Sequence, residues 1–259
     1  MNQLTVIVIT KNEATNIRDC LQSVTFADQI VVLDSGSTDN TVAIAKELGA
    51  EVYQSDQWPG FGEQKNRALL HAKGQWVLSL DADERVPADL AHAISAAIQP
   101  GEADAYVLDR RTQFCGQWIK HCGWTPDHVL RLFKRGEAQF SSDAVHEKLV
   151  LNNPAAKIVR LSPPMLHYSY RTPDDYWNKL QRYSKDWAMQ RYQQGQTTSM
   201  GRAALSGFFA FARSYFFKLG FLDGAMGFAV CSMQAQSAFG KYFELYSLQI
   251  KSADPSTPR

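Results

Sequence analysis

Short apolar runs rich in β-branched residues alternate with amphipathic stretches through the first hundred residues. The runs lie at residues 4–9, 30–33, 51–53 and 76–80, and such runs are typical of strands buried on both faces of a parallel sheet. Between them, apolar residues recur at spacings of three and four, which indicates helices with one buried face. Because strand and helix alternate four times, we expect an α/β fold with a mostly parallel sheet and helices on both faces.

The alternation ends near residue 105. Short strand-like pieces separated by turns follow, which predicts a mixed, partly antiparallel segment. Residues 173–250 instead form a continuous helical pattern that carries 17 of the 30 aromatic residues. We therefore expect a first domain (1–170), made of an alternating α/β half (1–100) and a mixed segment (101–170), followed by a helical extension (171–259).

Composition adds the charge distribution and the state of the cysteines. The 259 residues are 45% hydrophobic and 20% charged, as in ordinary globular proteins. The net charge is +1, but residues 171–259 hold 11 Lys and Arg against 6 Asp and Glu, so the helical extension is the basic part. The four cysteines are irregularly spaced, which predicts free thiols in a reducing compartment. The first residues lack the features of a signal peptide, so we expect a cytoplasmic protein.

Acidic residues follow three of the predicted strands. They are Glu13, Asp34 and the pair Asp81 and Asp83. Since ligands bind at the carboxyl ends of parallel strands, we expect these carboxylates to face one crevice. Asp81 and Asp83, one residue apart at a strand end, could hold Mg²⁺ or Mn²⁺, which prefer oxygen ligands and often bridge to phosphates. Helix capping and compensation of the helix dipole explain the local pattern equally well.

The turn at residues 34–39 supplies hydroxyls and backbone N–H groups at a helix start, where anions and nucleotides are readily held. A well-capped helix would have the same composition. The chain lacks the glycine-rich dinucleotide motif, the Walker lysine loop and the Gly-x-Ser-x-Gly elbow, which argues against those enzyme classes. Its basic residues form no compact patch within a known module, so we expect no nucleic-acid partner.

Three motifs follow one another in a specific order. They are Val-Ile-Val-Ile-Thr-Lys-Asn-Glu at 6–13, Val-Leu-Asp-Ser-Gly-Ser-Thr-Asp-Asn-Thr at 32–41 and Leu-Asp-Ala-Asp-Glu at 80–84. Over roughly residues 4–150 the chain thus resembles the inverting family 2 glycosyltransferases of the GT-A fold. The resemblance implies a nucleotide-sugar donor and a divalent metal, Mn²⁺ or Mg²⁺. It also implies that residues 1–170 are the catalytic domain, with a nucleotide-sugar-binding half (1–100) and an acceptor-side segment (101–170).

The resemblance also implies roles for individual residues on the donor side. Asp83 matches the metal ligand, and Asp81 matches a group that shares the metal or supports the ribose or metal-bound waters. Lys65 and Arg67 match a basic helix that faces the diphosphate, although without the resemblance a solvated helix face is the better interpretation. The positions that match contacts to the nucleoside or donor are Thr10, Glu13, Asp34 and Ser37.

An inverting transfer needs a general base for the acceptor hydroxyl and a metal for the departing diphosphate. Many family members carry an acidic pair after the sheet, whereas this chain has Glu147 in a His-Glu pair, and we assign Glu147 as the base with Asp143 as the reserve. His167 is a candidate metal or phosphate contact. Trp118 and Trp124 could form an acceptor platform because sugars stack on aromatic faces, with core packing as an equal alternative.

The aromatic density of residues 203–231 exceeds what a small soluble domain requires. Arg213, Lys218 and Asp223 interrupt the segment, and no stretch of 18 uncharged apolar residues exists, which disfavours a transmembrane span. We expect an amphipathic segment that lies on an anionic membrane surface. The alternative is a helical bundle that packs on the catalytic domain or on a dimer partner.

The whole chain most closely resembles the lipopolysaccharide inner-core β-1,4-glucosyltransferases of bacteria. For that family the donor is UDP-glucose, and the acceptor is a heptose of a lipid-anchored core oligosaccharide on the cytoplasmic face of the inner membrane. Transfer to another lipid-linked or surface polysaccharide acceptor is the alternative within the family. Outside it, a nucleotidyltransferase also uses paired carboxylates, but the chain lacks a glycine-rich, basic N-terminal loop for a triphosphate. A membrane-associated binding module with a decayed site is the non-enzymatic alternative.

Overall fold

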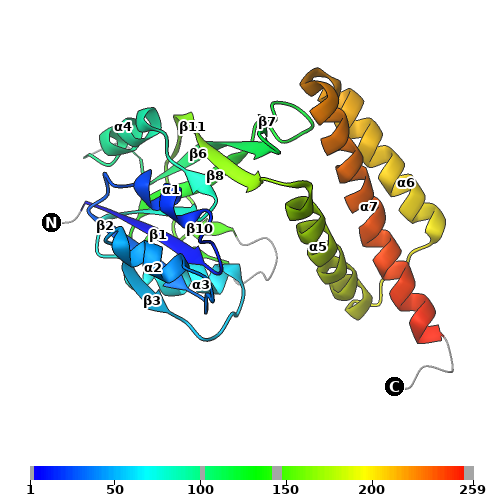
Figure 1. The fold of residues 1–259 in the computed structure, drawn as a ribbon, viewed down its shortest axis with the longest axis horizontal. Coiled ribbons are helices and arrows are strands. Elements are labelled where there is room, and N and C mark those ends of the chain that lie inside the picture. Colours follow the sequence, from blue (N-terminus) through cyan, green and yellow to red (C-terminus); the bar gives the residue numbers. More distant parts are fainter. Residues whose placement is uncertain (1–2, 100–102, 142–147, 254–259) are drawn as a thin grey trace. The chain divides into compact units, whose positions relative to one another are not determined.

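The structure is a computed structural model, and it describes residues 3–99, 103–141 and 148–253 (Figure 1). The chain divides into two compact units. The first unit holds residues 1–111 and 127–168, and the second holds residues 112–126 and 169–259.

The first unit is built on a mixed sheet with the strand order β3-β2-β1-β4-β8-β6-β11-β5. Four neighbouring strands are parallel: β1 (Leu4–Thr10), β2 (Gln29–Asp34), β3 (Glu51–Gln54) and β4 (Trp76–Asp81). β8 (His128–Lys134) pairs antiparallel with β4 and with β6 (Ala105–Phe114), and β11 (Ile158–Tyr170) pairs antiparallel with the short β5 (Glu84–Arg85). β6 and β11 continue beyond the first unit, into residues that belong to the second.

Helices cover both faces of the parallel strands. On β1, Val6 and Val8 contribute to the core beneath one face, and Ile7 and Ile9 contribute to the core beneath the other. The first core includes side chains from α1 (Ile17–Gln22), α2 (Thr41–Glu47) and α4 (Ala88–Ala97), and the second includes α3 (Phe61–Leu69) and the hairpin of β9 (Ala138–Phe140) and β10 (Leu149–Leu151). This arrangement confirms the predicted α/β fold.

The register of the parallel strands aligns the acidic strand ends. Thr10, the last residue of β1, is opposite Asp34, the last residue of β2. On the other side of β1, Ile9 is opposite Asp81, which ends β4. The turns that follow these three strands therefore leave the sheet at one edge, as the topology predicts.

The second unit is helical, which confirms the predicted C-terminal extension. It contains β7 (Gln117–Trp118), α5 (Pro173–Gln193), α6 (Met200–Ala212), a π turn η1 (Arg213–Phe217), a 3-10 turn η2 (Gly220–Asp223) and α7 (Gly224–Ala253). Figure 1 shows α6 and α7 side by side, with η1 and η2 joining them at one end. Helix α5 begins with a capping box, in which the Thr172 hydroxyl accepts from the Asp175 N–H.

Residues 112–126 pack with these helices. The buried side chains of Ile119 and Cys122 lie in one cluster with Val230 and Cys231 of α7. The expected boundary at residue 170 assigned this segment to the catalytic domain by its place in the sequence. The difference arises because the segment buries its apolar side chains against a helix more than 100 residues further along the chain.

Among the helices of the described residues, none is by itself both long and apolar enough to cross a membrane. The segments Met200–Phe217 and Gly220–Ile250 meet the length and composition criteria only as a pair, and this pair is bent by 72° at the break between them.

Candidate active site at the carboxyl edge of the sheet

Asp34 is completely buried at the end of β2, where its carboxylate organises the turn that follows. Oδ1 accepts hydrogen bonds from the hydroxyls of Thr10 at 3.2 Å and Ser37 at 2.5 Å. Oδ2 accepts from the N–H groups of Gly36 at 3.0 Å and Ser37 at 2.9 Å. Gly36 has φ +78°, a conformation that glycine adopts without steric cost. Three of the residues expected at the nucleoside, Thr10, Asp34 and Ser37, therefore lie together.

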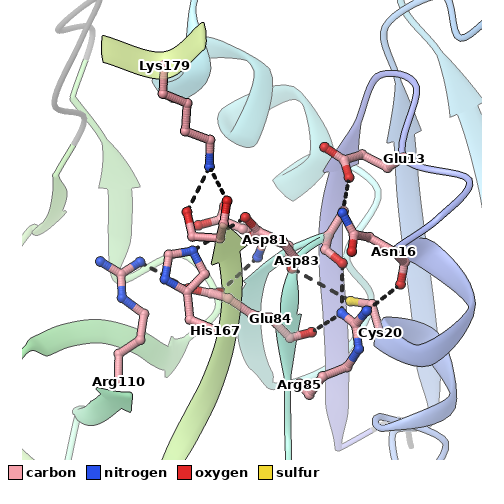
Figure 2. Close-up of polar contacts among 12 residues, drawn as sticks. Glu13, Asn16, Cys20, Asp81, Asp83, Glu84, Arg85, Arg110, His167 and Lys179 are labelled. Carbon is pink, nitrogen blue, oxygen red and sulfur yellow. Dashed lines mark hydrogen bonds and ion pairs between the residues drawn. The ribbon is translucent and has the colours of Figure 1, made fainter. Parts of the chain in front are cut away.

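The loop after β1 is tied to the loop after β2. The N–H of Asn12 donates to the Ser37 hydroxyl at 2.8 Å, and the N–H of Glu13 donates to the Thr41 hydroxyl at 2.8 Å. The Glu13 carboxylate accepts from the side-chain amide of Asn16 at 2.7 Å (Figure 2). These bonds hold the backbone of both loops in place, so Glu13 is positioned beside the turn that Asp34 organises.

Asp81, at the end of β4, lies between two cationic side chains. Lys65 of α3 places Nζ 2.9 Å from Oδ1, and Arg131 of β8 places Nη2 2.5 Å from Oδ2. Both cations are buried, with Lys65 2% and Arg131 6% exposed. Burial disfavours the charged carboxylate, but Arg131 and Lys65 outweigh it and hold the pKa of Asp81 well below its usual range. Asp81 is therefore an ionised group with both oxygens engaged.

Glu84 extends this charged network and is completely buried. Its Oε1 accepts from Nη2 of Arg131 at 2.6 Å and from Nη1 of Arg110 at 3.1 Å, and its Oε2 accepts from the N–H of Asp81 at 2.9 Å. Burial lowers the pKa of Arg131, but the neighbouring carboxylates of Asp81 and Glu84 outweigh this effect. The net result is a pKa above the usual value of arginine, so the guanidinium stays charged. The network fixes the position of the Asp81 backbone as well as its side chain.

Sequence reasoning missed Arg131, Glu84 and Arg110. Arg131 interrupts the apolar run Val129–Phe133, and a charged residue in the middle of a run that resembles a buried strand was the available signal. Glu84 is the last residue of the third motif, and the motif alone gives no sign that its side chain is buried in an ionic network. Arg110 also pairs with Asp127, at 2.8 Å from Nε to Oδ2, and had no signal in its local pattern.

Asp83 faces His167, which β11 brings back to this edge (Figure 2). His167 Nε2 lies 3.4 Å from Asp83 Oδ2, and the two side chains are 13% and 19% exposed. The pairing of β11 with β5 places His167 opposite Glu84, and the N–H of Tyr168 donates to the Asp83 carbonyl at 2.8 Å. Backbone bonds therefore hold the carboxylate and the imidazole beside each other.

The two basic residues of α3 have different surroundings. Lys65 is directed at Asp81 and also lies over the Phe140 ring, 5.5 Å from its centroid, so it does not occupy a solvated helix face. Arg67 donates from Nη1 to the Ser55 hydroxyl at 2.9 Å and lies 3.5 Å from Glu63. Arg67 thus supports the loop that follows β3, at the same edge of the sheet.

The remaining candidates are the two expected bases and the two tryptophans. Asp143 and Glu147, the expected bases, fall outside the described residues. Trp118 and Trp124 belong to the second unit. The Trp124 ring packs against those of Phe114 and Tyr170, at centroid distances of 6.1 and 5.5 Å. The acceptor platform stays a prediction.

Within the described residues, no group of three or more His, Cys, Asp and Glu side chains is arranged to hold a metal ion. Asp83 and His167 nevertheless have the spacing of two ligands. Ligands at about 2.1 Å from an octahedral metal, on adjacent corners, lie about 3.0 Å apart, and Oδ2 and Nε2 are separated by 3.4 Å. Mg²⁺ is commonly held by one or two carboxylates together with waters and substrate phosphates. A carboxylate and an imidazole therefore fit a metal that completes its coordination with a diphosphate.

Comparisons with known proteins find glycosyltransferases. An uncharacterised glycosyltransferase of Rickettsia prowazekii is 29% identical over 99% of this chain and 91% of its own length. The lipopolysaccharide core biosynthesis glycosyltransferase LpsC of Rhizobium meliloti is 27% identical over 98% of this chain and 95% of its own length. Among solved structures, glucosyl-3-phosphoglycerate synthase of Mycobacterium tuberculosis, in complex with Mn²⁺, UDP-glucose and phosphoglyceric acid, is 27% identical over 42% of this chain and 44% of that chain, with a TM-score of 0.38. The model of the family described as glycosyl transferase family 2 matches residues 5–148, more than half of the chain, and the protein belongs to that family.

Proposed function

We propose that this glycosyltransferase moves a hexose, glucose from UDP-glucose, to a heptose of the lipopolysaccharide inner core. The observation that carries the donor chemistry is the pair of Asp83 and His167 beside the fixed carboxylate of Asp81. The similarity to LpsC along almost the whole chain supports the class of acceptor. The acceptor would be lipid-anchored, on the cytoplasmic face of a bacterial inner membrane. Another lipid-linked or surface polysaccharide acceptor is the alternative.

Asp83 and His167 would hold the metal, Mn²⁺ or Mg²⁺. When bound, the metal stabilises the negative charge of the departing diphosphate. Asp81 would stay outside the direct ligands because Lys65 and Arg131 already engage both of its oxygens. Its fixed carboxylate would instead accept hydrogen bonds from the ribose or from metal-bound water.

The loops after β1 and β2 would hold the nucleoside. Thr10, Glu13, Asp34 and Ser37 lie where these loops are tied together, and their hydrogen bonds set the shape of the turn before any donor arrives. Arg67, and Lys65 through its charge, would face the diphosphate. A preorganised site of this kind lowers the cost of binding because its loops are already ordered.

Inversion requires that the acceptor oxygen attack the anomeric carbon on the side opposite the diphosphate while a base takes its proton. We assign this role to Glu147, with Asp143 in reserve, because the resemblance matches Glu147 to the family's base. The carboxylates of Asp81 and Glu84 cannot serve, since each is paired with buried arginine or lysine side chains.

The direct test is transfer by the purified protein to a heptose-terminated core saccharide. UDP-glucose with Mn²⁺ should give a glucosylated product with inverted anomeric configuration, detected by mass spectrometry and NMR. Asp83→Asn should abolish transfer, whereas Glu47→Gln, which removes an exposed carboxylate of α2, should leave it unchanged.

A panel of nucleotide sugars, each with and without Mn²⁺, separates the possible outcomes. The true donor should raise the melting temperature because it binds only the native state. Transfer from a different nucleotide sugar would show that UDP-glucose is not the donor, but the reaction would still be the transfer of a sugar from a nucleotide sugar. No transfer from any nucleotide sugar to heptose-terminated or other lipid-linked acceptors would contradict the proposed function.

A further inference from the structure

Helix α6 has small residues on its buried side and large apolar residues on its exposed side. Ala203 and Gly207 are buried, and a methyl group at Gly207 would lie 3.1 Å from the carbonyl oxygen of Ala235 in α7. Leu205, Phe208 and Phe209 are 56%, 66% and 62% exposed. A surface helix of a soluble protein has the opposite pattern, with its large apolar residues inside. Small residues between helices and large apolar residues outside are typical of helices in contact with lipid.

The exposed apolar surface continues around the turn between α6 and α7. Phe217 is 81% exposed, and the Tyr215 ring links Phe216, Phe221 and Phe228, whose centroids lie 5.2, 6.1 and 5.9 Å from its own. The patch is therefore continuous at the end of the hairpin. We give the name aromatic surface to the exposed apolar side chains of α6, of the turn and of the start of α7, which are Leu205, Phe208, Phe209, Phe216, Phe217, Leu219, Phe221, Leu222 and Phe228.

The exposed charged residues of the sequence segment that carries the aromatic surface, residues 187–243, are all basic. Between residues 187 and 243 the only acidic residue is Asp223. Its carboxylate is 5% exposed and accepts from the N–H groups of Lys120 and His121 at 3.1 and 2.8 Å. The exposed charged residues in and next to the aromatic surface are Arg202, Arg213 and Lys218.

We propose that the aromatic surface docks on an anionic phospholipid bilayer, with its apolar side chains at the boundary between headgroups and acyl chains. Arg202, Arg213 and Lys218 would lie at the lipid phosphates. Large aromatic and aliphatic side chains flanked by basic residues are the composition that binds this interface. A second copy of the chain is a poorer occupant because it would bring the same positive charges to the same surface. Docking does not depend on which sugar is transferred.

Sedimentation of the full chain with vesicles tests the proposal. Vesicles that contain phosphatidylglycerol should pellet the protein, pure phosphatidylcholine vesicles should pellet much less, and added salt should weaken the binding. Phe217→Ser should reduce the affinity about tenfold, as expected for one aromatic side chain withdrawn from the bilayer. The matched control is Leu70→Ser at the end of α3, which is 83% exposed and should bind like the wild type.

A second variant tests how much the basic residues contribute to binding. Arg213→Gln with Lys218→Gln should reduce binding to anionic vesicles by about fivefold for each charge and leave binding to phosphatidylcholine unchanged. Circular dichroism and thermal unfolding should match the wild type for all variants, because each changed side chain is exposed.

Four results would overturn the proposal. The wild type could fail to pellet with anionic vesicles, or Phe217→Ser could pellet as well as the wild type. A wild-type dimer that Phe217→Ser dissociates in the absence of vesicles would show that a second copy covers the surface. Protein that remains in the vesicles after alkaline carbonate extraction would show that a segment crosses the bilayer. Asp83→Asn should pellet normally while it fails in transfer, so failure of docking and failure of the proposed reaction are distinguishable.

Discussion

Arg131 donates from Nη2 to Asp81 Oδ2 at 2.5 Å, from the middle of a buried strand. The same nitrogen lies 2.6 Å from Oε1 of Glu84. Removing water from three charged groups is costly, and the cost is offset only when each group is paired. The ion pair of Arg131 and Asp81 therefore holds an oriented carboxylate two residues before Asp83 in the chain, before any ligand binds.

The first prediction concerns this network. Arg131→Met should lower the free energy of unfolding by about 3 kcal/mol, because it leaves the buried Glu84 and Asp81 carboxylates short of a partner. Urea unfolding followed by circular dichroism measures the change. Arg18→Met is the matched control, since it breaks the exposed ion pair with Glu47 and should change stability little. Equal losses in the two variants would contradict a special role for burial.

The second prediction concerns the proposed metal ligands. Asp83→Asn and His167→Gln should each weaken Mn²⁺ binding in the presence of UDP by more than about tenfold. A loss of about tenfold is the lower end of what is typical when a group that only supports a metal ligand is removed. Electron paramagnetic resonance of free Mn²⁺ measures the affinity directly. Glu47→Gln should bind as the wild type does. Normal Mn²⁺ affinity in His167→Gln would leave the imidazole with a structural role.

The third prediction concerns the base. Glu147→Gln should lower kcat by about 10²- to 10⁴-fold, the usual contribution of general base catalysis, and leave the affinity for the donor unchanged. Asp143→Asn should keep most of the turnover. The opposite result for the two variants would transfer the role to Asp143, and normal turnover in both would place the base elsewhere.

The fourth prediction uses the cysteines, all of which are free thiols in the structure. Burial raises the pKa of the Cys20 and Cys122 thiols, so at pH 8 the reactive thiolate is scarce in the native protein and becomes commoner as the pH rises. Burial raises the pKa of the Cys115 thiol as well, but Cys115 is only partly buried whereas the other three cysteines are buried, so Ellman's reagent at pH 8 should label Cys115 faster than the others. All four should react in urea. Labelling of fewer than four cysteines in urea would reveal a disulfide.

The fifth prediction concerns the close packing of α7 on η2. A methyl group at Gly227 would lie 1.9 Å from the carbonyl oxygen of Gly220, so Gly227→Ala should destabilise the helical unit by about 3 kcal/mol. Gly201→Ala in α6 is the control. A methyl group there meets only the Ser199 hydroxyl, at 3.9 Å, and alanine favours the helix. Thermal unfolding compares the two, and equal stability would contradict the close approach of η2 and α7.

Sequence alone determined the features that depend on local pattern and on topology. The apolar runs and the periodic stretches between them predicted the parallel strands and their covering helices, because side-chain periodicity follows directly from backbone geometry. Topology then predicted that Asp34 and Asp81 would lie at the ends of strands that leave the sheet at one edge. The three motifs predicted family 2, which the family match confirms.

The tertiary structure alone decided which charged groups meet. Lys65, which its local pattern would have placed on a solvated face, is buried against Asp81, and Arg131 reaches the same carboxylate from 50 residues away. The segment with Trp118 and Trp124 packs with helices that follow much later in the chain. Such contacts depend on strand order, register and the packing of distant segments. No local periodicity encodes these relations, because the residues that satisfy one another are neighbours only after the chain has folded.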